Sequence, residues 1–226
     1  MQNKYFGDKH DFYKYYFLKE ITKDYSLGIH WCLNNRIEEN NNDGKFKLTE
    51  KEKRKDEILY NLLVKYRHKD IKYIEPYFPK KTKYYKTLLK EYYLEHIYED
   101  EAIEWLKTQD IIFFDPDNGI EVKTMTNEEK NKFVTYRHLI KYWNMGKSLI
   151  IYQHERGNRH QTEEKIKILF ELVKKQANVI KVIKGSVTFI CFIQGEKHYI
   201  VKDEIARFKQ NKEYTIENWN NTGDIM

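Results

Sequence analysis

Apolar and polar positions alternate along the chain in blocks that predict strands and helices in turn. Runs that are apolar almost throughout, typical of strands buried on both faces of a sheet, occupy residues 27–33, 110–115, 147–153 and 187–193. Apolar residues recur at helical spacing in residues 8–21, 49–65, 81–107, 126–143 and 162–175. Residues 71–74 form a short strand candidate, residues 198–201 are expected to pair with 187–193 in a hairpin, and a short helix is expected near residue 203.

Strands that alternate with helices predict an α/β fold, in which a mostly parallel Rossmann-like sheet has helices on both faces and a C-terminal antiparallel hairpin. The length of 226 residues suits one domain, which we expect to span residues 1–226 with a helical insertion at about 48–107. In such sheets ligands bind at the carboxyl ends of the strands. Polar residues that follow the strands are therefore the candidate site.

Composition narrows the class of partner. The net charge of +6 and a pI near 8.9 are compatible with nucleic acid. Tyrosines and lysines interleave on the helices at residues 60–93, either as a stacking and phosphate-binding surface or as ordinary half-buried helix faces. We expect a cytoplasmic protein with no membrane partner, because the sequence shows neither a signal peptide nor a long apolar run, and we expect Cys32 and Cys191 to be reduced. The oligomeric state is left open.

The most distinctive segment follows the strand at residues 110–115 and reads Asp115-Pro116-Asp117-Asn118-Gly119. Two carboxylates this close at a strand end are costly to leave unpaired, so they require a metal, a substrate donor or a catalytic role. We take Asp115, Asp117 and Asn118 as candidate catalytic residues. The simpler interpretation is a turn in which Asp115 caps the loop.

Two chemistries compete for this segment. Amino-methyltransferases place an Asp-Pro-Pro-Tyr or Asn-Pro-Pro-Tyr motif after this strand; Asp115-Pro116 fits, but Asp117 and Asn118 replace the proline and the stacking tyrosine. Alternatively, Pro116-Asp117 followed by Glu121-Val122-Lys123 resembles the acidic motif of metal-dependent nucleases, where acids hold Mg²⁺ or Mn²⁺ and the lysine contacts substrate or water. The short gap between the two halves weakens this second match.

Two further groups flank the expected site. Asp8, Asp11 and Lys14 share one helix face, where a helix start and a point charge suit a cofactor or an anion, although a capped helix with an ion pair explains them equally. Asn42-Asp43-Gly44 occupies the place of a cofactor loop, but it lacks the glycine-rich pattern and is otherwise a turn.

The third group follows the strand at residues 147–153. In Tyr152-Gln153-His154-Glu155-Arg156, His154 suits a base or a metal ligand, and Arg156 suits a phosphate or substrate contact. The alternative is a solvated strand end. In the nuclease interpretation Asp115, Asp117 and His154 together would hold the metal.

Taken together, these motifs resemble a family of small, largely uncharacterised bacterial and phage-associated proteins. Its pattern of GDxxDxxKY, LGxxW, NDG, DPDNG and YxHxxR is matched over about residues 4–160. The arginine of the last motif is one residue closer to the histidine here, and Arg159 is a second candidate for it.

The order of strand, Asp-Pro motif, helix, strand, helix and hairpin also resembles class I methyltransferases, and the Gly7–Tyr15 segment is similar to the opening of those that modify an adenine N6 of 23S ribosomal RNA. The resemblance implies that Lys14 lies near S-adenosylmethionine and that Asp115 lies near the target amine. We expect Asp8, Asp11 and Asp43 to contact the cofactor as well. In the methyltransferase hypothesis, His154, Arg156 and Lys123 lie on the substrate side.

Three functions therefore stay open at the level of the sequence. The first is a nucleic-acid-directed methyltransferase that uses S-adenosylmethionine. The second is a metal-dependent nuclease or phosphoesterase with a role in defence or on a mobile element. The third is a non-catalytic nucleic-acid-binding module on a degenerate methyltransferase fold.

Overall fold

The computed structural model describes residues 3–34, 46–88, 95–126, 129–155, 159–195, 198–210 and 212–219. Its α-helices are α1 (Lys9–Ile21), α2 (Glu50–Lys55), α3 (Glu57–Lys65), α4 (Glu95–Leu106), α5 (Tyr136–Asn144), α6 (Arg159–Leu172) and α7 (Tyr199–Phe208). Short 3₁₀ helices are η1 (Asn3–Tyr5), η2 (Ile71–Tyr77) and η4 (Lys130–Lys132). The strands are β1 (Leu27–His30), β2 (Lys83–Tyr85), β3 (Ile111–Phe114), β4 (Ser148–His154), β5 (Ala177–Lys184), β6 (Val187–Gln194) and β7 (Thr215–Asn218).

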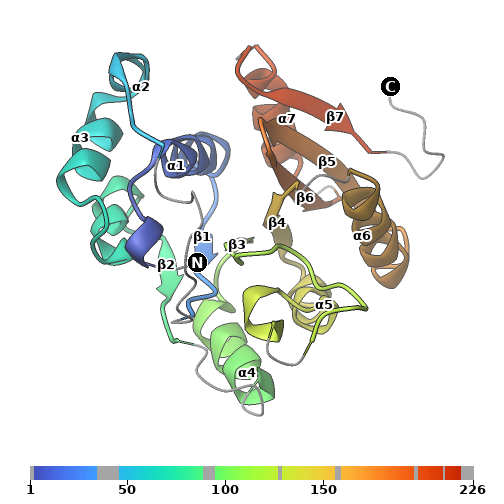
Figure 1. Ribbon diagram of the computed structural model, residues 1–226. Coiled ribbons are helices and arrows are strands. Elements are labelled where there is room, and N and C mark those ends of the chain that lie inside the picture. Colours follow the sequence, from blue (N-terminus) through green and yellow to red (C-terminus); the bar gives the residue numbers. More distant parts are fainter. Residues whose placement is uncertain are drawn as a thin grey trace.

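The strands form one mixed sheet of seven strands in the order β2-β1-β3-β4-β6-β5-β7 (Figure 1). Strands β2, β1, β3 and β4 run parallel, whereas β6 is antiparallel to both of its neighbours, β4 and β5, and β7 is antiparallel to β5. The α/β class predicted from the sequence is therefore confirmed, with a parallel half followed by an antiparallel half.

Helices cover both faces of the sheet, as the sequence predicts. Helices α1, α3 and α7 pack in one apolar core, and α4, α5 and α6 pack in the other. Strand β3 shows why the sheet is buried on both sides: Ile111 and Phe113 enter the first core, while Ile112 and Phe114 enter the second. Successive side chains of a strand point to opposite faces, so an unbroken apolar run serves both cores.

Local capping fixes where the first helices begin. Asp8 caps α1, and its side chain accepts hydrogen bonds from the backbone N–H groups of His10 and Asp11. Thr49 and Glu52 form the expected capping box at α2. Asp56 ends α2 and caps α3, so the helix expected at residues 49–65 is two short helices.

The hairpin expected between residues 187–193 and 198–201 is wrong. Strand β6 pairs with β5 along its full length around the turn at Gly185, whose φ of +62° suits glycine, while residues 199–208 form helix α7. The sequence reading of this region has no strand at β5, and it has none at β7.

Four other expectations need correction. Residues 71–77 form η2 rather than a strand, and β2, inside the range expected to be a helical insertion, joins the sheet as the parallel neighbour of β1. Thr126 does contact Glu129, but α5 begins later, after Thr135. Helix α6 begins before Thr162, which instead donates to Glu155.

Both cysteines are free thiols and are buried, as expected. In the part of the chain that the structure describes, no helix combines the length and the apolar character needed to cross a bilayer.

Candidate functional site

The parallel half of the sheet has a topological switch point between β1 and β3. The chain leaves β1 toward β2 on one side, whereas it leaves β3 toward β4 on the other. Connections that diverge in this way open a crevice at the carboxyl ends of the two strands, and this is where open α/β sheets bind ligands. Residues 31–34 and the Asp115–Gly119 segment follow these two strands, so the motif singled out from the sequence lies at the switch point.

A side-chain hydrogen bond joins the two strand ends. Asn34 Nδ2 donates to Asp117 Oδ2 across 2.8 Å. Asn34 is buried, whereas Asp117 and Asn118 are half-buried. The reachable polar side chains of the motif are therefore Asp117 and Asn118, while Asp115 lies beneath them with 2% of its surface exposed.

The start of α1 brings the first predicted acidic residues to this edge. Asp8 is the helix cap, and Asp11 Oδ2 accepts a hydrogen bond of 2.8 Å from the backbone N–H of Gly7. Burial, together with the nearby carboxylate of Asp11, raises the pKa of Asp8 to about 7. These two acids thus satisfy the start of the helix, and both are buried.

Lys14 links α1 to β3. Its Nζ lies 2.7 Å from Asp11 Oδ1 and 2.8 Å from Asp115 Oδ2, and it also lies 5.0 Å from the ring centroids of Tyr15 and Tyr152. Burial by itself lowers the pKa of Lys14, but the carboxylates of Asp11 and Asp115 outweigh it and raise the pKa well above its ordinary value. For Asp115, burial raises the pKa and the Lys14 ammonium opposes that effect. An ammonium held between two carboxylates and two aromatic rings is an anchor inside the protein.

Gln153 holds the motif in its shape, and the sequence reading did not single it out. Gln153 Oε1 accepts from the backbone N–H of Ile120 (3.1 Å), and Nε2 donates to the carbonyl of Asn118 (3.4 Å). Gly119 between them has φ +79°, and a Cβ there would lie 2.0 Å from Gln153 Oε1. The glycine in the motif and the glutamine near the end of β4 therefore form one unit, and Gly119 is the only one of the two that a sequence pattern marks.

A buried lysine on α6 completes this unit. Lys165 Nζ donates to Gln153 Oε1 across 3.2 Å and lies 6.0 Å from the ring centroid of Phe133. Burial lowers the pKa of Lys165 to about 8, against the attraction of Glu155. Nothing in the spacing of α6 distinguishes this lysine from its solvated neighbours, so no sequence signal could have found it.

The residues expected on the substrate side are more scattered. His154 ends β4, half-buried, with its ring 5.1 Å from that of Tyr152. Lys123 is exposed, and Glu121 accepts a hydrogen bond of 2.6 Å from the backbone N–H of Tyr136 at the start of α5. In the motif proposed for a nuclease, Glu121 thus contacts the start of α5, whereas Lys123 lies at the surface.

Nor do the expected metal ligands gather in one place. Within the described ranges, no three His, Cys, Asp or Glu side chains come close enough together to hold an ion. Asp115 is ion-paired with Lys14, and Asp117 accepts from Asn34. Asp43 and Arg156 lie outside the described residues, as does the side chain of Arg159.

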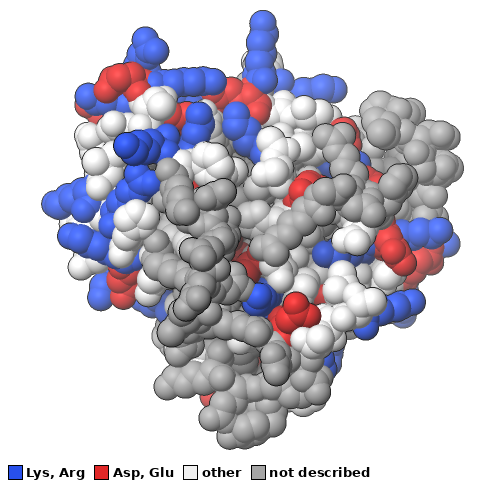
Figure 2. Space-filling view, viewed as in Figure 1, with Lys and Arg blue, Asp and Glu red and all other residues white. Residues whose placement is uncertain are grey.

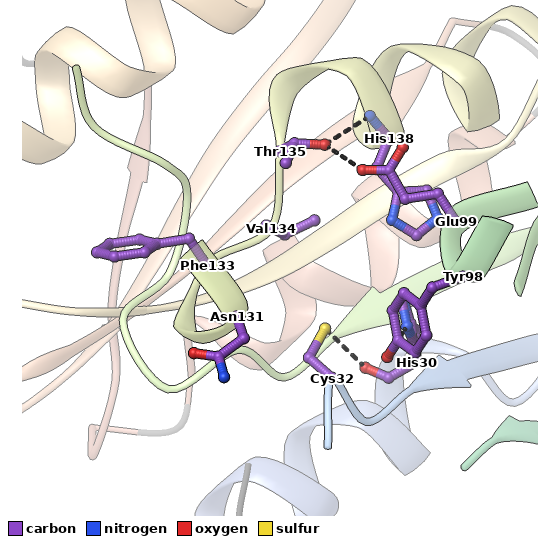
Figure 3. A pocket seen from close by; sticks show the side chains of 9 residues that line it. All are labelled: His30, Cys32, Tyr98, Glu99, Asn131, Phe133, Val134, Thr135 and His138. Atoms are coloured by element: carbon purple, nitrogen blue, oxygen red, sulfur yellow. Dashed lines mark hydrogen bonds between the residues drawn. The ribbon is translucent and has the colours of Figure 1, made fainter. Parts of the chain in front are cut away.

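A pocket adjoins the motif on the α4–α5 side of the sheet (Figure 3). Its lining residues are His30, Cys32, Tyr98, Glu99, Asn131, Phe133, Val134, Thr135 and His138. Two backbone hydrogen bonds connect this wall to the motif, from Asn118 N to Lys132 O (2.8 Å) and from Val134 N to Gly119 O (3.0 Å). The pocket and the motif are therefore parts of one rigid surface.

The pocket surface is more apolar than polar, and it carries no charged imidazole. Burial lowers the pKa of His30 to about 3 and that of His138 well below its ordinary value, so both rings are neutral at physiological pH. His30 contacts the Tyr98 hydroxyl at 2.9 Å, while His30 Nδ1 and His138 Nε2 have no hydrogen-bond partner within the described residues. Glu99 is ion-paired with Arg137. The pocket thus offers hydrogen bonds to an uncharged polar group or to water.

Comparisons with known proteins add little to this geometry. No protein-family model matches the chain, and no curated protein matches it. The crystal structure of a Legionella pneumophila protein assigned to the family DUF519 superposes with a TM-score of 0.47 at 10% identity, covering 95% of this chain and 98% of that one. At this identity and TM-score the likeness carries no argument about activity.

Proposed function

We propose that the chain is a methyltransferase-like enzyme that acts on nucleic acid and uses S-adenosylmethionine at the switch point between β1 and β3. The observation that carries the proposal is the hydrogen bond from Asn34 to Asp117, because it joins the two strand ends at the place where open α/β sheets bind ligands. The position of β6 supports it further: an antiparallel strand beside β4 agrees with the class I methyltransferase ending to which the sequence is similar.

The residues fit the cofactor in a different way from the one that the resemblance implies. Asp8, Asp11, Lys14 and Asp115 are buried and bound to one another, so in this proposal they hold α1 against β3 instead of contacting the cofactor. The half-buried Asp117 is the acceptor offered to a ligand. S-adenosylmethionine, when bound, supplies an electrophilic methyl group.

Other residues hold the turn that carries Asp117 and Asn118 in position. Gln153 and Lys165 keep the Asn118–Ile120 turn fixed, so that Asp117 and Asn118 stand at a constant distance from β1. A metal-dependent nuclease has less support, because Asp115 is already paired with Lys14.

Calorimetry with S-adenosylmethionine and S-adenosylhomocysteine, first in metal-free buffer and then with Mg²⁺, tests the proposal. We expect saturable binding that does not need the metal, and binding about tenfold weaker in Asp117→Ala, since a hydrogen bond to a charged group contributes roughly 1.5 kcal/mol. Asp203→Ala, an exposed acid on α7, is the matched control and should bind as the wild type does. If the wild type binds neither compound but cleaves nucleic acid with Mn²⁺, the nuclease replaces this proposal.

A further inference from the structure

The positive charge of the chain is concentrated in one segment. Residues 46–86, which contain α2, α3, η2 and β2, hold thirteen Lys and Arg against six Asp and Glu, a net charge of +7. The whole chain carries +6, so all the other residues together carry −1. Residues 46–86 are therefore strongly basic, whereas the other residues together are nearly neutral.

This charge is displayed on the surface. Figure 2 shows Lys and Arg side chains gathered at the upper left, where Figure 1 places α2 and α3. Some have an ion-pair partner, since Lys51 pairs with Glu213, Lys86 with Glu75 and, at the surface, Lys72 with Asp70 at 3.4 Å. Others are exposed and have no ion pair within the described residues, among them Arg54, Lys65, Lys69, Lys80, Lys81 and Lys83.

Part of the segment combines the lysines with stacked aromatic rings. Tyr66 and Tyr73 lie parallel, with ring centroids 4.1 Å apart and an interplanar angle of 4°, and both are half-buried. Lys65 and Lys69 lie 5.1 Å and 5.7 Å from the Tyr66 ring centroid, and Lys72 lies 5.7 Å from that of Tyr73. We call these five residues the lysine–tyrosine cluster. Cations next to flat rings are the combination that binds phosphates and bases of single strands.

The cluster is held in a fixed relation to the candidate site. A Cβ on Gly7 would lie 2.8 Å from Arg67 Cα and 2.9 Å from Leu63 O, so the end of α3 sits directly against the start of α1. The backbone N–H of His68 also donates to Phe6 O across 2.8 Å. From that contact α1 runs to Lys14 and its bond with Asp115.

We propose that the lysine–tyrosine cluster binds single-stranded nucleic acid and directs it toward the switch point. Lys65, Lys69 and Lys72 contact successive phosphates, and the tyrosine pair gives the bases a flat apolar surface. The inference deepens the proposed function and rests on it for the destination of the strand, but the binding needs no cofactor and is measured without one.

Fluorescence anisotropy with a short labelled single-stranded RNA, over a range of salt concentrations, tests the cluster. Replacing Lys65, Lys69 and Lys72 together by Glu should weaken binding at least tenfold and reduce the slope of log affinity against log salt by about 2, since each phosphate contact on a single strand contributes about 0.7. The control replaces the exposed Lys167 on α6, Lys174 after α6 and Lys209 after α7 by Glu, which changes the net charge equally outside residues 46–86. The control should keep most of the affinity.

A second variant addresses the rings. Tyr66→Ala should weaken binding to the single strand about tenfold, since a base loses the ring on which it stacks. Equal loss in both lysine triples, tighter binding to a duplex than to the single strand, or binding only to phosphatidylserine vesicles would overturn the inference. If the wild type binds the RNA but does not bind S-adenosylmethionine, the proposed function is wrong and the inference about the cluster stands.

Discussion

Lys14 on α1 donates a buried hydrogen bond of 2.8 Å to Asp115 at the end of β3, across 101 positions of sequence. Both residues belong to motifs that the sequence reading assigned to separate tasks, the lysine to a cofactor and the aspartate to a target amine. Their contact makes them one structural unit. Lys14 with Asp11 fixes the start of α1 relative to the strand end that carries the candidate site.

Replacing Lys14 by Met should lower the free energy of unfolding by about 3–5 kcal/mol, because it leaves two buried carboxylates without their cation. Urea denaturation measures the change. Lys23→Met, an exposed lysine just after α1 that pairs with Glu204 at 3.2 Å, should cost less than about 1 kcal/mol. The double variant Lys14→Met/Asp115→Asn should lose less than the sum of its single changes. Equal losses for Lys14 and Lys23 would contradict the buried anchor.

Asp8 should make stability depend on pH in an unusual direction for an acid. Its pKa is raised from 3.8 to about 7, so the folded protein binds the proton more tightly than the unfolded chain does. The contribution of Asp8 is fully present below about pH 4 and is lost as the pH rises through about 7. Asp8→Asn keeps a capping side chain and should be more stable than the wild type at about pH 8, with little difference at about pH 4.

Urea denaturation of both proteins over this pH range is the measurement. An Asp8→Asn variant that is less stable than the wild type by the same amount at every pH would show that the carboxylate is needed as a cap and that its ionisation has no effect.

Gly119→Ala should destabilise the protein more than Gly185→Ala. Both glycines have positive φ, +79° and +62°, and an alanine in the left-handed region costs roughly 1–2 kcal/mol at either position. At Gly119 the new methyl group would also displace Gln153, whereas at Gly185 it meets nothing within 4 Å. Urea midpoints of the two variants should differ, and only Gly119→Ala should weaken S-adenosylmethionine binding. Indistinguishable midpoints would mean that Gln153 does not hold the turn.

The two pocket histidines should not titrate in the physiological range. Burial lowers the pKa of His30 to about 3 and that of His138 well below 6.5, so their imidazole resonances should stay constant between about pH 8 and about pH 5. The stability that they contribute is present above about pH 6.5 and falls as the pH decreases toward 3, the sign opposite to that of Asp8. NMR spectra of the wild type, assigned with His30→Gln and His138→Gln, give the titration curves. A midpoint near 6.5 for either ring would contradict the burial of that imidazole.

The sheet was predictable where its strands are apolar on both faces. Strand β3, Ile111 to Phe114, was predicted correctly because it is a short, unbroken apolar run. Strand β5 was not predicted because Lys181 interrupts its apolar run. Only the fold shows that this lysine pairs with Glu163 and Glu217. The hairpin was assigned to the wrong partner because residues 199–201 are a short apolar run, which fits a strand as well as a helix.

The position of the Asp115–Gly119 segment in the fold was predictable, but the contacts of its side chains were not. The apolar run before it indicated that the Asp115–Gly119 segment follows a buried strand, and the structure places it at the carboxyl end of β3, where Lys14 joins it to α1. Spacing alone could not show that Lys14 would point at Asp115, because that contact depends on how α1 packs on the sheet. Gln153 was overlooked for a similar reason, since its role depends on the positive φ of Gly119 on a neighbouring strand end.

The position of β6 has a consequence for how the chain folds. This strand lies between β4 and β5, yet it follows both in the sequence. Until residues 187–194 have been synthesised, the edge of β4 that pairs with β6 has no partner. Strand β4 carries the apolar residues Leu149, Ile150 and Ile151. An open apolar edge is a template for pairing with another chain. A ribosome-bound chain that stops before β6 should therefore aggregate, and the antiparallel half of the sheet protects the parallel half that precedes it.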